Sequence, residues 1–117
     1  MTAETAARLA RTIHPTKVVF QGEPGANSHI ACSDVFPEAE AVATATFEDC
    51  FAAMEGGEAD LGIIPIENSV AGRVADIHHL LPTSSLSIIG EYFLPIHHQL
   101  LGLAGSSAQS ISAVQSH

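Results

Sequence analysis

The stretch LGIIPI at residues 61–66 constrains the fold of this chain more than any other feature. A strand with one face in water alternates apolar and polar residues, whereas a continuous apolar run of this length is typical of a strand covered on both faces. The β-branched and aromatic segment KVVFQ at residues 17–21 predicts another strand. We therefore expect a sheet that is buried between layers of helices.

Apolar residues also recur at helical spacing between the expected strands. One stripe runs over residues 47–54 and follows Thr46, which together with Asp49 resembles a capping box. A second stripe is expected to begin near Ser69 and to end at Pro82. The elements expected are helices over residues 3–13, 28–36, 47–55 and 69–81, and strands over residues 17–21, 41–45, 61–66, 86–94 and 96–103.

Strands that alternate with helices through short connections predict an α/β fold with a mostly parallel sheet flanked by helices. The chain has 117 residues, 46% of them hydrophobic, which is enough for one small domain with a packed core. In such sheets, ligands bind beyond the carboxyl ends of the strands. Residues 22–28 and residues 67–69 both hold this position after a strand, and we expect the two segments to face one crevice.

The charge balance limits the ligands that this chain can attract. It carries 13 acidic and four basic residues, for a formal net charge of −9. That balance opposes binding to nucleic acid and to anionic membranes, and no apolar run is long enough to span a membrane. An anionic ligand would depend on local donors such as helix N-termini or Arg73. Cys32 and Cys50 lack metal-ligand spacing and are interpreted as reduced, buried thiols of a cytoplasmic protein.

The segment GEPGANS, residues 22–28, has the pattern G-x-x-G-x-x-S. Gly22 and Gly25 allow the backbone to approach a ligand or to take positive φ, and the helix that follows offers free N–H groups to an anion. The alternative is an ordinary strand–turn–helix connection in which Asn27 or Ser28 caps the helix. The dinucleotide-binding and P-loop patterns are both absent from this segment.

The segment PIENSVAG, residues 65–72, places three hydrogen-bonding side chains in succession where a strand is expected to end. Asn68 and Ser69 can each donate and accept, and Glu67 can accept hydrogen bonds or, if partly buried, hold a proton. A capped helix needs only one polar side chain at its start. The alternative is nevertheless a helix cap beside a solvated glutamate.

Two histidine pairs, His78-His79 and His97-His98, raise the question of a metal. Neighbouring histidines point in different directions on a helix or a strand, so one pair cannot chelate from one face. Metal would bind only if one histidine from each pair met in space, and we expect no metal site. No spacing of Cys or His residues supports nucleophilic catalysis. Arg73 is interpreted as a solvated surface residue unless it meets an acid.

Taken together, four stretches resemble the prephenate dehydratase family. They are FQGEPGANSHIA, ATFEDCFAAMEGGEADLGIIPIENSVAGRVADIHHLL, IIGEYFLPIHHQLLGL and the final VQSH, in an order and spacing that match over roughly residues 17–117. The combination of G-x-x-G-x-x-S, P-I-E-N-S and E-x-x-L-P-I-x-H is specific, although each motif alone is weak.

The resemblance implies a catalytic domain of two α/β lobes, like a type II periplasmic binding protein, with the site between them. Residues 1–16 are then a helical extension, residues 17–95 the first lobe, and residues 96–117 the start of a second, incomplete lobe. The implied activity is that of a carbon–oxygen lyase, which converts prephenate to phenylpyruvate in phenylalanine biosynthesis. No metal or organic cofactor is implied. Family members commonly carry an ACT domain that binds phenylalanine as a feedback inhibitor, and this chain has none.

The family pattern also assigns roles to individual residues. It implies catalytic contacts by Glu67 and Asn68, and substrate-binding contacts by Gly22, Gly25, Ser28, Ser69 and Ser116. The family's Thr-Arg-Phe motif, which supplies a hydroxyl and a guanidinium, is absent from this chain. We therefore interpret the chain as an N-terminal fragment that does not catalyse the reaction alone, and we expect incomplete lobes to form a homo-oligomer.

Two other interpretations remain open from the residues alone. The chain can be a small-acid-binding lobe of the same fold that performs no chemistry, or a structural fragment that is stable only as an oligomer. Within the enzyme interpretation, prephenate and arogenate are not distinguished.

Overall fold

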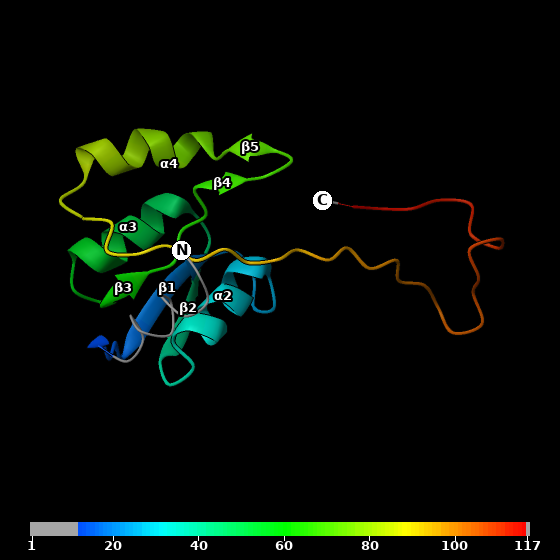
Figure 1. The fold of residues 1–117 in the computed structure, drawn as a ribbon, viewed down its shortest axis with the longest axis horizontal. Helices are drawn as coiled ribbons and strands as arrows, with labels where there is room; N and C mark the ends of the chain where they lie inside the picture. Colours follow the sequence, from blue (N-terminus) through cyan, green and yellow to red (C-terminus); the bar gives the residue numbers. More distant parts are fainter. Residues whose placement is uncertain (1–11, 117) are drawn as a thin grey trace.

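The structure is a computed structural model that describes residues 12–116 (Figure 1). Its strands are β1 (Lys17–Gln21), β2 (Glu40–Thr44), β3 (Leu61–Gly62), β4 (Glu67–Asn68) and β5 (Gly72–Arg73). Its helices are α2 (Asn27–Val35), α3 (Phe47–Glu55), α4 (Ala75–Leu80) and the 3-10 helix η1 (Leu81–Thr83). The helix expected over residues 3–13 falls mostly outside the described residues.

A three-stranded parallel sheet in the order β2-β1-β3 forms the centre of the fold. Lys17 of β1 pairs with Glu40 at one end of β2, and Gln21 pairs with Thr44 at the other. The three central residues of β1 are at most 1% exposed, as the middle strand of a sheet covered on both faces should be. The predicted α/β class with a mostly parallel sheet flanked by helices is confirmed.

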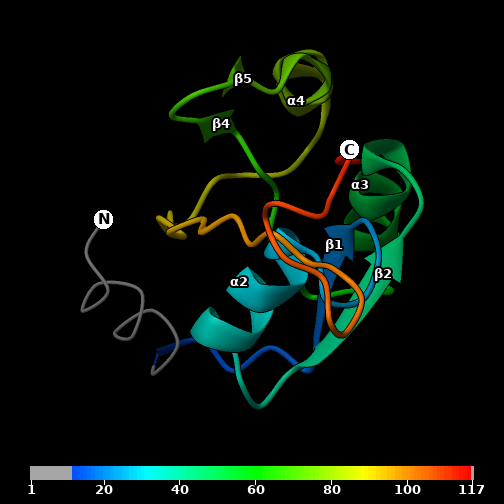
Figure 2. The same ribbon diagram turned by 90° about the vertical axis from the view of Figure 1, so that its right-hand side faces the viewer.

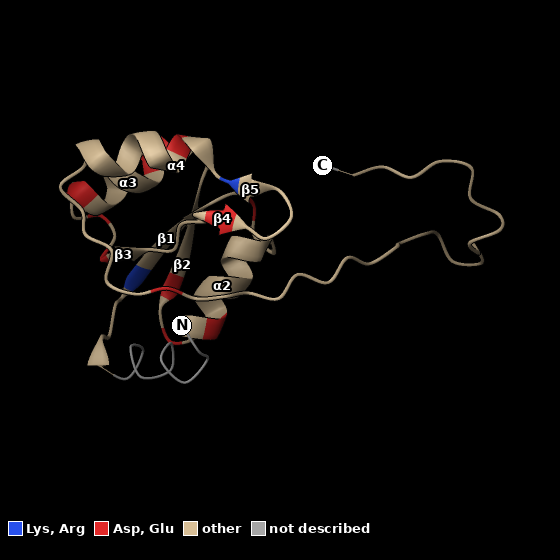
Figure 3. Ribbon diagram, turned by 45° about the horizontal axis from the view of Figure 1, so that its top comes forward, with Lys and Arg blue, Asp and Glu red and all other residues tan. Residues whose placement is uncertain are grey.

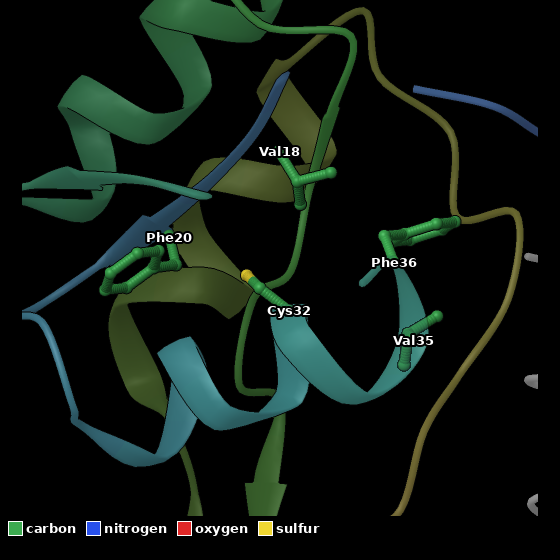
Figure 4. Close-up of a cluster of buried hydrophobic side chains, with 5 residues drawn as sticks. All are labelled: Val18, Phe20, Cys32, Val35 and Phe36. Carbon is green, nitrogen blue, oxygen red and sulfur yellow. The ribbon is translucent and has the colours of Figure 1, made fainter. Parts of the chain in front are cut away.

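Successive residues of β1 point to opposite faces of the sheet and create two hydrophobic clusters. Figure 4 shows the cluster between the sheet and α2, which consists of Val18, Phe20, Cys32, Val35 and Phe36. The cluster on the other face consists of Val19, Cys50, Phe51, Ala59 and Ile77, from β1, α3, α4 and the connection after α3. The sheet therefore lies between α2 on one face and α3 with α4 on the other (Figure 2).

The helix start predicted at Thr46 is confirmed. Thr46 is the N-cap of α3, and its side-chain oxygen accepts the Asp49 N–H at 3.1 Å. The helix start predicted at Asn27 or Ser28 is displaced by one or two residues. Ala26 is the N-cap of α2 and makes no side-chain cap bond, so Asn27 and Ser28 lie inside the first turn.

The prediction of one strand over residues 61–66 and one helix over residues 69–81 is wrong in its middle part. The strand ladder ends at Gly62, although Ile63 still donates its N–H to the Val19 carbonyl at 3.0 Å. An antiparallel hairpin of β4 and β5 then precedes α4, with Gly72 at φ +83° after the turn. The apolar spacing of Val70 and Val74 fitted a helix, but tight-turn geometry determined the local structure.

The strands predicted over residues 86–94 and 96–103 are also absent from the described part of the chain. Residues 84–116 form an irregular segment that crosses the domain and then extends away from it (Figure 1). Leu86 and Tyr92 still pack against the two clusters. Beyond them no neighbouring strand is present, and β-branched or aromatic composition alone does not form a strand. No helix within residues 12–116 is long and apolar enough to cross a membrane.

Candidate functional site

The predicted site residues, except Ser116, lie in or directly after two segments that leave the sheet at the same edge. Residues 22–26 follow β1 and lead into α2, and residues 63–66 lead from β3 into the β4–β5 hairpin. Because β1 and β3 are parallel, both segments leave the sheet at its carboxyl edge. Both segments therefore leave the sheet at the edge that the sequence predicted, and the second leads into a hairpin where a helix was predicted.

The glycines of the first segment shape a turn, and their N–H groups are already bonded. Gly22 and Gly25 have φ values of +123° and +91°, which other residues adopt only with strain. The Gly22 N–H donates to the Thr44 carbonyl at 3.0 Å, and the Gly25 N–H donates to Nδ1 of His29 at 2.8 Å. Neither glycine therefore offers a free amide in this conformation.

Free donors are found instead in the first turn of α2. Within residues 12–116, no hydrogen bond engages the backbone N–H groups of Asn27, Ser28 and His29 or the Ser28 hydroxyl. The first turn of any helix leaves such amides unpaired, and the helix dipole adds a partial positive charge there. Ser28 is half-buried. Its hydroxyl and these three amides together make the N-terminal end of α2 polar.

The second segment leads into the β4–β5 hairpin, which presents several polar side chains. The Asn68 Oδ1 accepts the N–H groups of Val70 and Ala71, both at 2.9 Å, and so holds the turn in place. Its Nδ2 donates no hydrogen bond within the described residues and remains a donor for a ligand. Ser69 lies in the turn itself and is exposed.

Glu67 and Arg73 are cross-strand neighbours in the hairpin, and both are exposed. Directly opposed residues project on the same side of an antiparallel pair. No ion pair joins the two side chains in the part of the chain that the structure describes. Figure 3 shows the basic position on β5 beside the acidic position on β4, while the other described basic residue, Lys17, begins β1 at the opposite edge.

Ser116 is not brought to these segments by any contact within the described chain. It lies near the end of the irregular segment and is exposed. A cavity of about 370 Å³ lies instead between β2 and α3, and none of the predicted site residues lines it. The two segments leave the sheet at the same edge, but within the described residues α2 makes no contact with β4 or β5.

The histidine pairs do not assemble with acidic or thiol groups. His78 and His79 are exposed on α4, and His97 and His98 are exposed in the irregular segment. Among residues 12–116, no group of three or more His, Cys, Asp or Glu side chains is placed to hold a metal ion. His29 is the histidine that contacts the candidate site, and the sequence analysis did not single it out. Its place four residues after Gly25 was the available signal.

The fold defines an α/β protein with polar groups at the carboxyl edge of its parallel sheet. Comparison with known proteins is more specific, since residues 18–117 match the family model described as prephenate dehydratase. The chain belongs to the prephenate dehydratase family.

Similar proteins come from bacteria and plants. The chain is 42% identical over 100 residues to the bifunctional N-acyl-homoserine lactone acylase/prephenate dehydratase of Komagataeibacter europaeus, covering 86% of this chain and 36% of that protein. It is 40% identical over 101 residues to arogenate dehydratase 1 of Petunia hybrida, covering 86% of this chain and 24% of that protein. It is 36% identical over 108 residues to the bifunctional chorismate mutase/prephenate dehydratase of Escherichia coli (strain K12), covering 89% of this chain and 28% of that protein.

A solved structure gives the same result at the level of the fold. The structure described as "GqqA- a novel type of quorum quenching acylases" is 44% identical, with a TM-score of 0.65, and the match covers 70% of this chain and 42% of that one. This chain spans about a quarter to a third of the length of the three relatives.

Proposed function

We propose that this chain supplies one lobe of an enzyme that converts prephenate to phenylpyruvate in L-phenylalanine biosynthesis. Family membership supports the reaction class. The observation that carries the proposal is the position of two groups of unpaired donors at one sheet edge. The first turn of α2 provides backbone amides and the Ser28 hydroxyl, and the hairpin provides the Asn68 Nδ2 and the Ser69 hydroxyl.

The proposed domain organisation follows the two-lobed type II periplasmic-binding-protein plan. Residues 17–95 correspond to the first lobe, since both hydrophobic clusters and their partners fall between Val18 and Tyr92. Residues 96–117 correspond to the start of a second lobe, and residues 1–16 to an N-terminal extension. The polar groups at the carboxyl edge of the sheet support this plan because a second lobe would enclose them.

The chemistry proposed for the complete enzyme is decarboxylative dehydration. The bond between the ring and its carboxylate breaks, carbon dioxide leaves, and that electron pair enters the ring as the hydroxyl carbon–oxygen bond breaks. The departing hydroxide takes up a proton and leaves as water, and the ring becomes aromatic. An enzyme accelerates such a step by orienting the dianion and by donating hydrogen bonds or a proton to the leaving oxygen.

Each proposed site residue has a role that its position supports. Ser28 and the neighbouring amides of α2 bind one carboxylate, with the helix dipole contributing. Asn68 contacts the reacting part of the substrate through Nδ2, and Ser69 donates beside it. Glu67 accepts a hydrogen bond from the substrate hydroxyl, with Arg73 across the hairpin to offset its charge. The glycines act by shaping the loop, and Ser116 joins the site only when the second lobe is complete.

We further propose that the protein is cytoplasmic and forms a homo-oligomer. Two unpaired, buried cysteines are compatible with a reducing compartment. Large apolar side chains of the irregular segment are exposed and would be covered by a second copy or by further chain. They are Ile88, Ile89, Phe93, Ile96, Leu100, Leu101, Leu103, Ile111 and Val114. Regulation by phenylalanine would require an ACT domain on a longer chain.

A second candidate is a small-acid-binding lobe without catalysis. The unpaired amides of α2 favour it as much as they favour the enzyme, because they bind an anion without transforming it. The two proposals differ in turnover. The longer gene product should release phenylpyruvate from prephenate if it is an enzyme, and only bind prephenate if it is not. Assays with arogenate and with an N-acyl-homoserine lactone would test the activities that the relatives' names carry.

Binding by the present chain is tested by NMR titration with phenylpyruvate. We expect the amides of Ser28, Asn68 and Ser69 to shift together, with weakening in Ser28→Ala and no weakening in Ser33→Ala, the control on the same helix. Asn68→Asp keeps the oxygen that holds the turn but loses the Nδ2 donor, so it should weaken binding while leaving the hairpin amides in place. Shifts confined to other regions would contradict the proposed site.

A further inference from the structure

The His29 side chain is held on two sides within the domain. Its ring stacks on Phe20, with ring centroids 5.1 Å apart and an angle of 6° between the planes. Its Nδ1 accepts the Gly25 N–H at 2.8 Å. Phe20 is 1% exposed and belongs to the hydrophobic cluster beneath α2. The stack therefore joins the ring to the buried central strand of the sheet, and the hydrogen bond joins it to the loop.

The hydrogen bond also determines which ring nitrogen carries the proton. A nitrogen that accepts an N–H bond has its lone pair free, so the neutral imidazole carries its hydrogen on Nε2. The loop of residues 22–26 is then bonded at both of its glycines, through Gly22 to Thr44 of β2 and through Gly25 to His29 of α2. Its conformation is thereby tied to the sheet and to the helix.

We propose that His29 is a positioning residue, which holds the loop of residues 22–26 and thereby keeps the first turn of α2 open to an anion. The His29 ring accepts the Gly25 N–H and so joins the loop to α2, next to the Asn27, Ser28 and His29 amides that the first turn leaves unpaired. Without this acceptor, the Gly25 N–H, in a residue at φ +91°, has no bond that joins the loop to α2. The anion contact rests on the proposed function, whereas the loop-holding role does not.

Two substitutions separate the ring's packing from its hydrogen bond. His29→Phe keeps an aromatic ring to stack on Phe20 but has no acceptor for the Gly25 N–H. His29→Asn loses the stack but places an amide oxygen near the position of Nδ1. His98→Phe, at an exposed position of the irregular segment, is the matched control.

The test uses the 117-residue chain with nitrogen-15 labelling. We expect a scalar coupling across the hydrogen bond between the Gly25 nitrogen and Nδ1 of His29, and slow hydrogen exchange at the Gly25 amide. In His29→Phe the Gly25 amide should exchange about fivefold faster, and phenylpyruvate should bind about fivefold more weakly, while the unfolding midpoint changes little. His29→Asn should restore slow exchange, and His98→Phe should behave as wild type.

The outcomes also distinguish this inference from the proposed function. A wild-type chain without the coupling, or His29→Phe with unchanged Gly25 exchange, overturns the role of His29 whatever binds. If wild type shows the coupling but binds no phenylpyruvate, the proposed function fails and the Gly25 exchange rates alone decide whether His29 holds the loop. Equal loss of binding in His29→Phe and His29→Asn, with normal exchange in the latter, would also overturn it.

Discussion

Tyr92 donates its phenolic O–H to Oδ2 of Asp34 at 2.8 Å, although the two residues lie 58 positions apart in the chain. Tyr92 also packs against the cluster between the sheet and α2. The contact therefore fastens the irregular segment onto α2 just before that segment leaves the domain (Figure 1). It marks the last point at which the chain beyond residue 85 contributes to the hydrophobic core.

The Tyr92–Asp34 bond predicts an unusual tyrosine titration. The hydrogen bond to the Asp34 carboxylate, followed by partial burial, raises the pKa of Tyr92 above its ordinary value of 10.0. Because the folded-state pKa is raised, the bond stabilises the protein below the ordinary tyrosine pKa and is lost as pH rises through the raised value. Tyr92 is the single tyrosine of a chain without tryptophan, so ultraviolet absorbance reports it directly.

The measurement is an absorbance titration at alkaline pH, repeated on Asp34→Ala. We expect a midpoint above 10.0 in wild type and a downward shift of the midpoint in the variant. Glu38→Ala, at an exposed acidic position beyond the end of α2, is the control and should titrate as wild type does. Identical midpoints in wild type and Asp34→Ala would show that the bond is not formed in solution.

The N-cap of α3 predicts a stability change of known size. Thr46→Ala removes the oxygen that accepts the Asp49 N–H and leaves that amide without its partner. We expect the free energy of unfolding to fall by about 1 kcal/mol. Thr46→Ser keeps the hydroxyl and should recover most of this loss. Urea unfolding followed by circular dichroism measures the stability of both variants. A loss of less than about 0.3 kcal/mol in Thr46→Ala would show that the cap does not stabilise α3.

The comparison of sequence and structure separates local from non-local determinants. The β1 segment and the Thr46 cap were predictable because their signals, β-branched residues and a capping side chain, act within a few residues. The β4–β5 hairpin was not predictable, because the apolar spacing suited a helix. In the structure the Asn68 side chain instead accepts the N–H groups of Val70 and Ala71 and holds a turn. The strands expected beyond Ser85 do not form because no neighbouring strand pairs with these residues, and a local sequence pattern cannot reveal whether such a partner exists.

The candidate site also has features that the sequence could predict and features that it could not. Strand–helix alternation predicted that residues 22–28 and 67–69 follow strands at the carboxyl edge, and in the structure both segments leave the sheet at that edge. The occupied amides of Gly22 and Gly25 could not be foreseen, because their acceptors are the carbonyl of Thr44 and the ring of His29. Those acceptors are positioned by the sheet register and by the stack on Phe20.

We predict that the distal part of the irregular segment can be removed without loss of stability. None of the described residues beyond Tyr92 packs against either hydrophobic cluster. A variant that ends at Pro95 should therefore retain the free energy of unfolding of the full chain within about 0.5 kcal/mol. A variant that ends at Ser85 loses the contacts of Leu86 and Tyr92 and should be less stable by about 2 kcal/mol.

Light scattering on the same variants tests the role of the exposed apolar side chains. We expect the 117-residue chain to self-associate and the variant ending at Pro95 to associate less, because most of the exposed apolar residues lie beyond that point. A full chain that stays monomeric across micromolar concentrations would contradict the proposed homo-oligomer. Unfolding of the Pro95 variant would instead show that the distal segment packs on the domain.

Burial of the thiols predicts slow alkylation. Desolvation, followed by the influence of the Cys50 thiol, raises the pKa of Cys32 to about 11. At pH 8 the Cys32 side chain is therefore almost entirely the unreactive thiol, and it should react with iodoacetamide on the order of 100-fold more slowly than an exposed cysteine. The variant Ser107→Cys adds an exposed reference thiol to the irregular segment, so both rates come from one sample by mass spectrometry.

The same burial has a consequence for stability at high pH. Because the folded-state pKa of Cys32 is raised, burial of the neutral thiol stabilises the fold below the ordinary cysteine pKa, and this contribution is lost as pH rises through about 11. We expect the urea midpoint of wild type to fall over this range more steeply than that of Cys32→Ala, whose overall stability is lower at every pH. Equal alkylation rates at Cys32 and at the reference thiol would show that the cluster beneath α2 opens in solution.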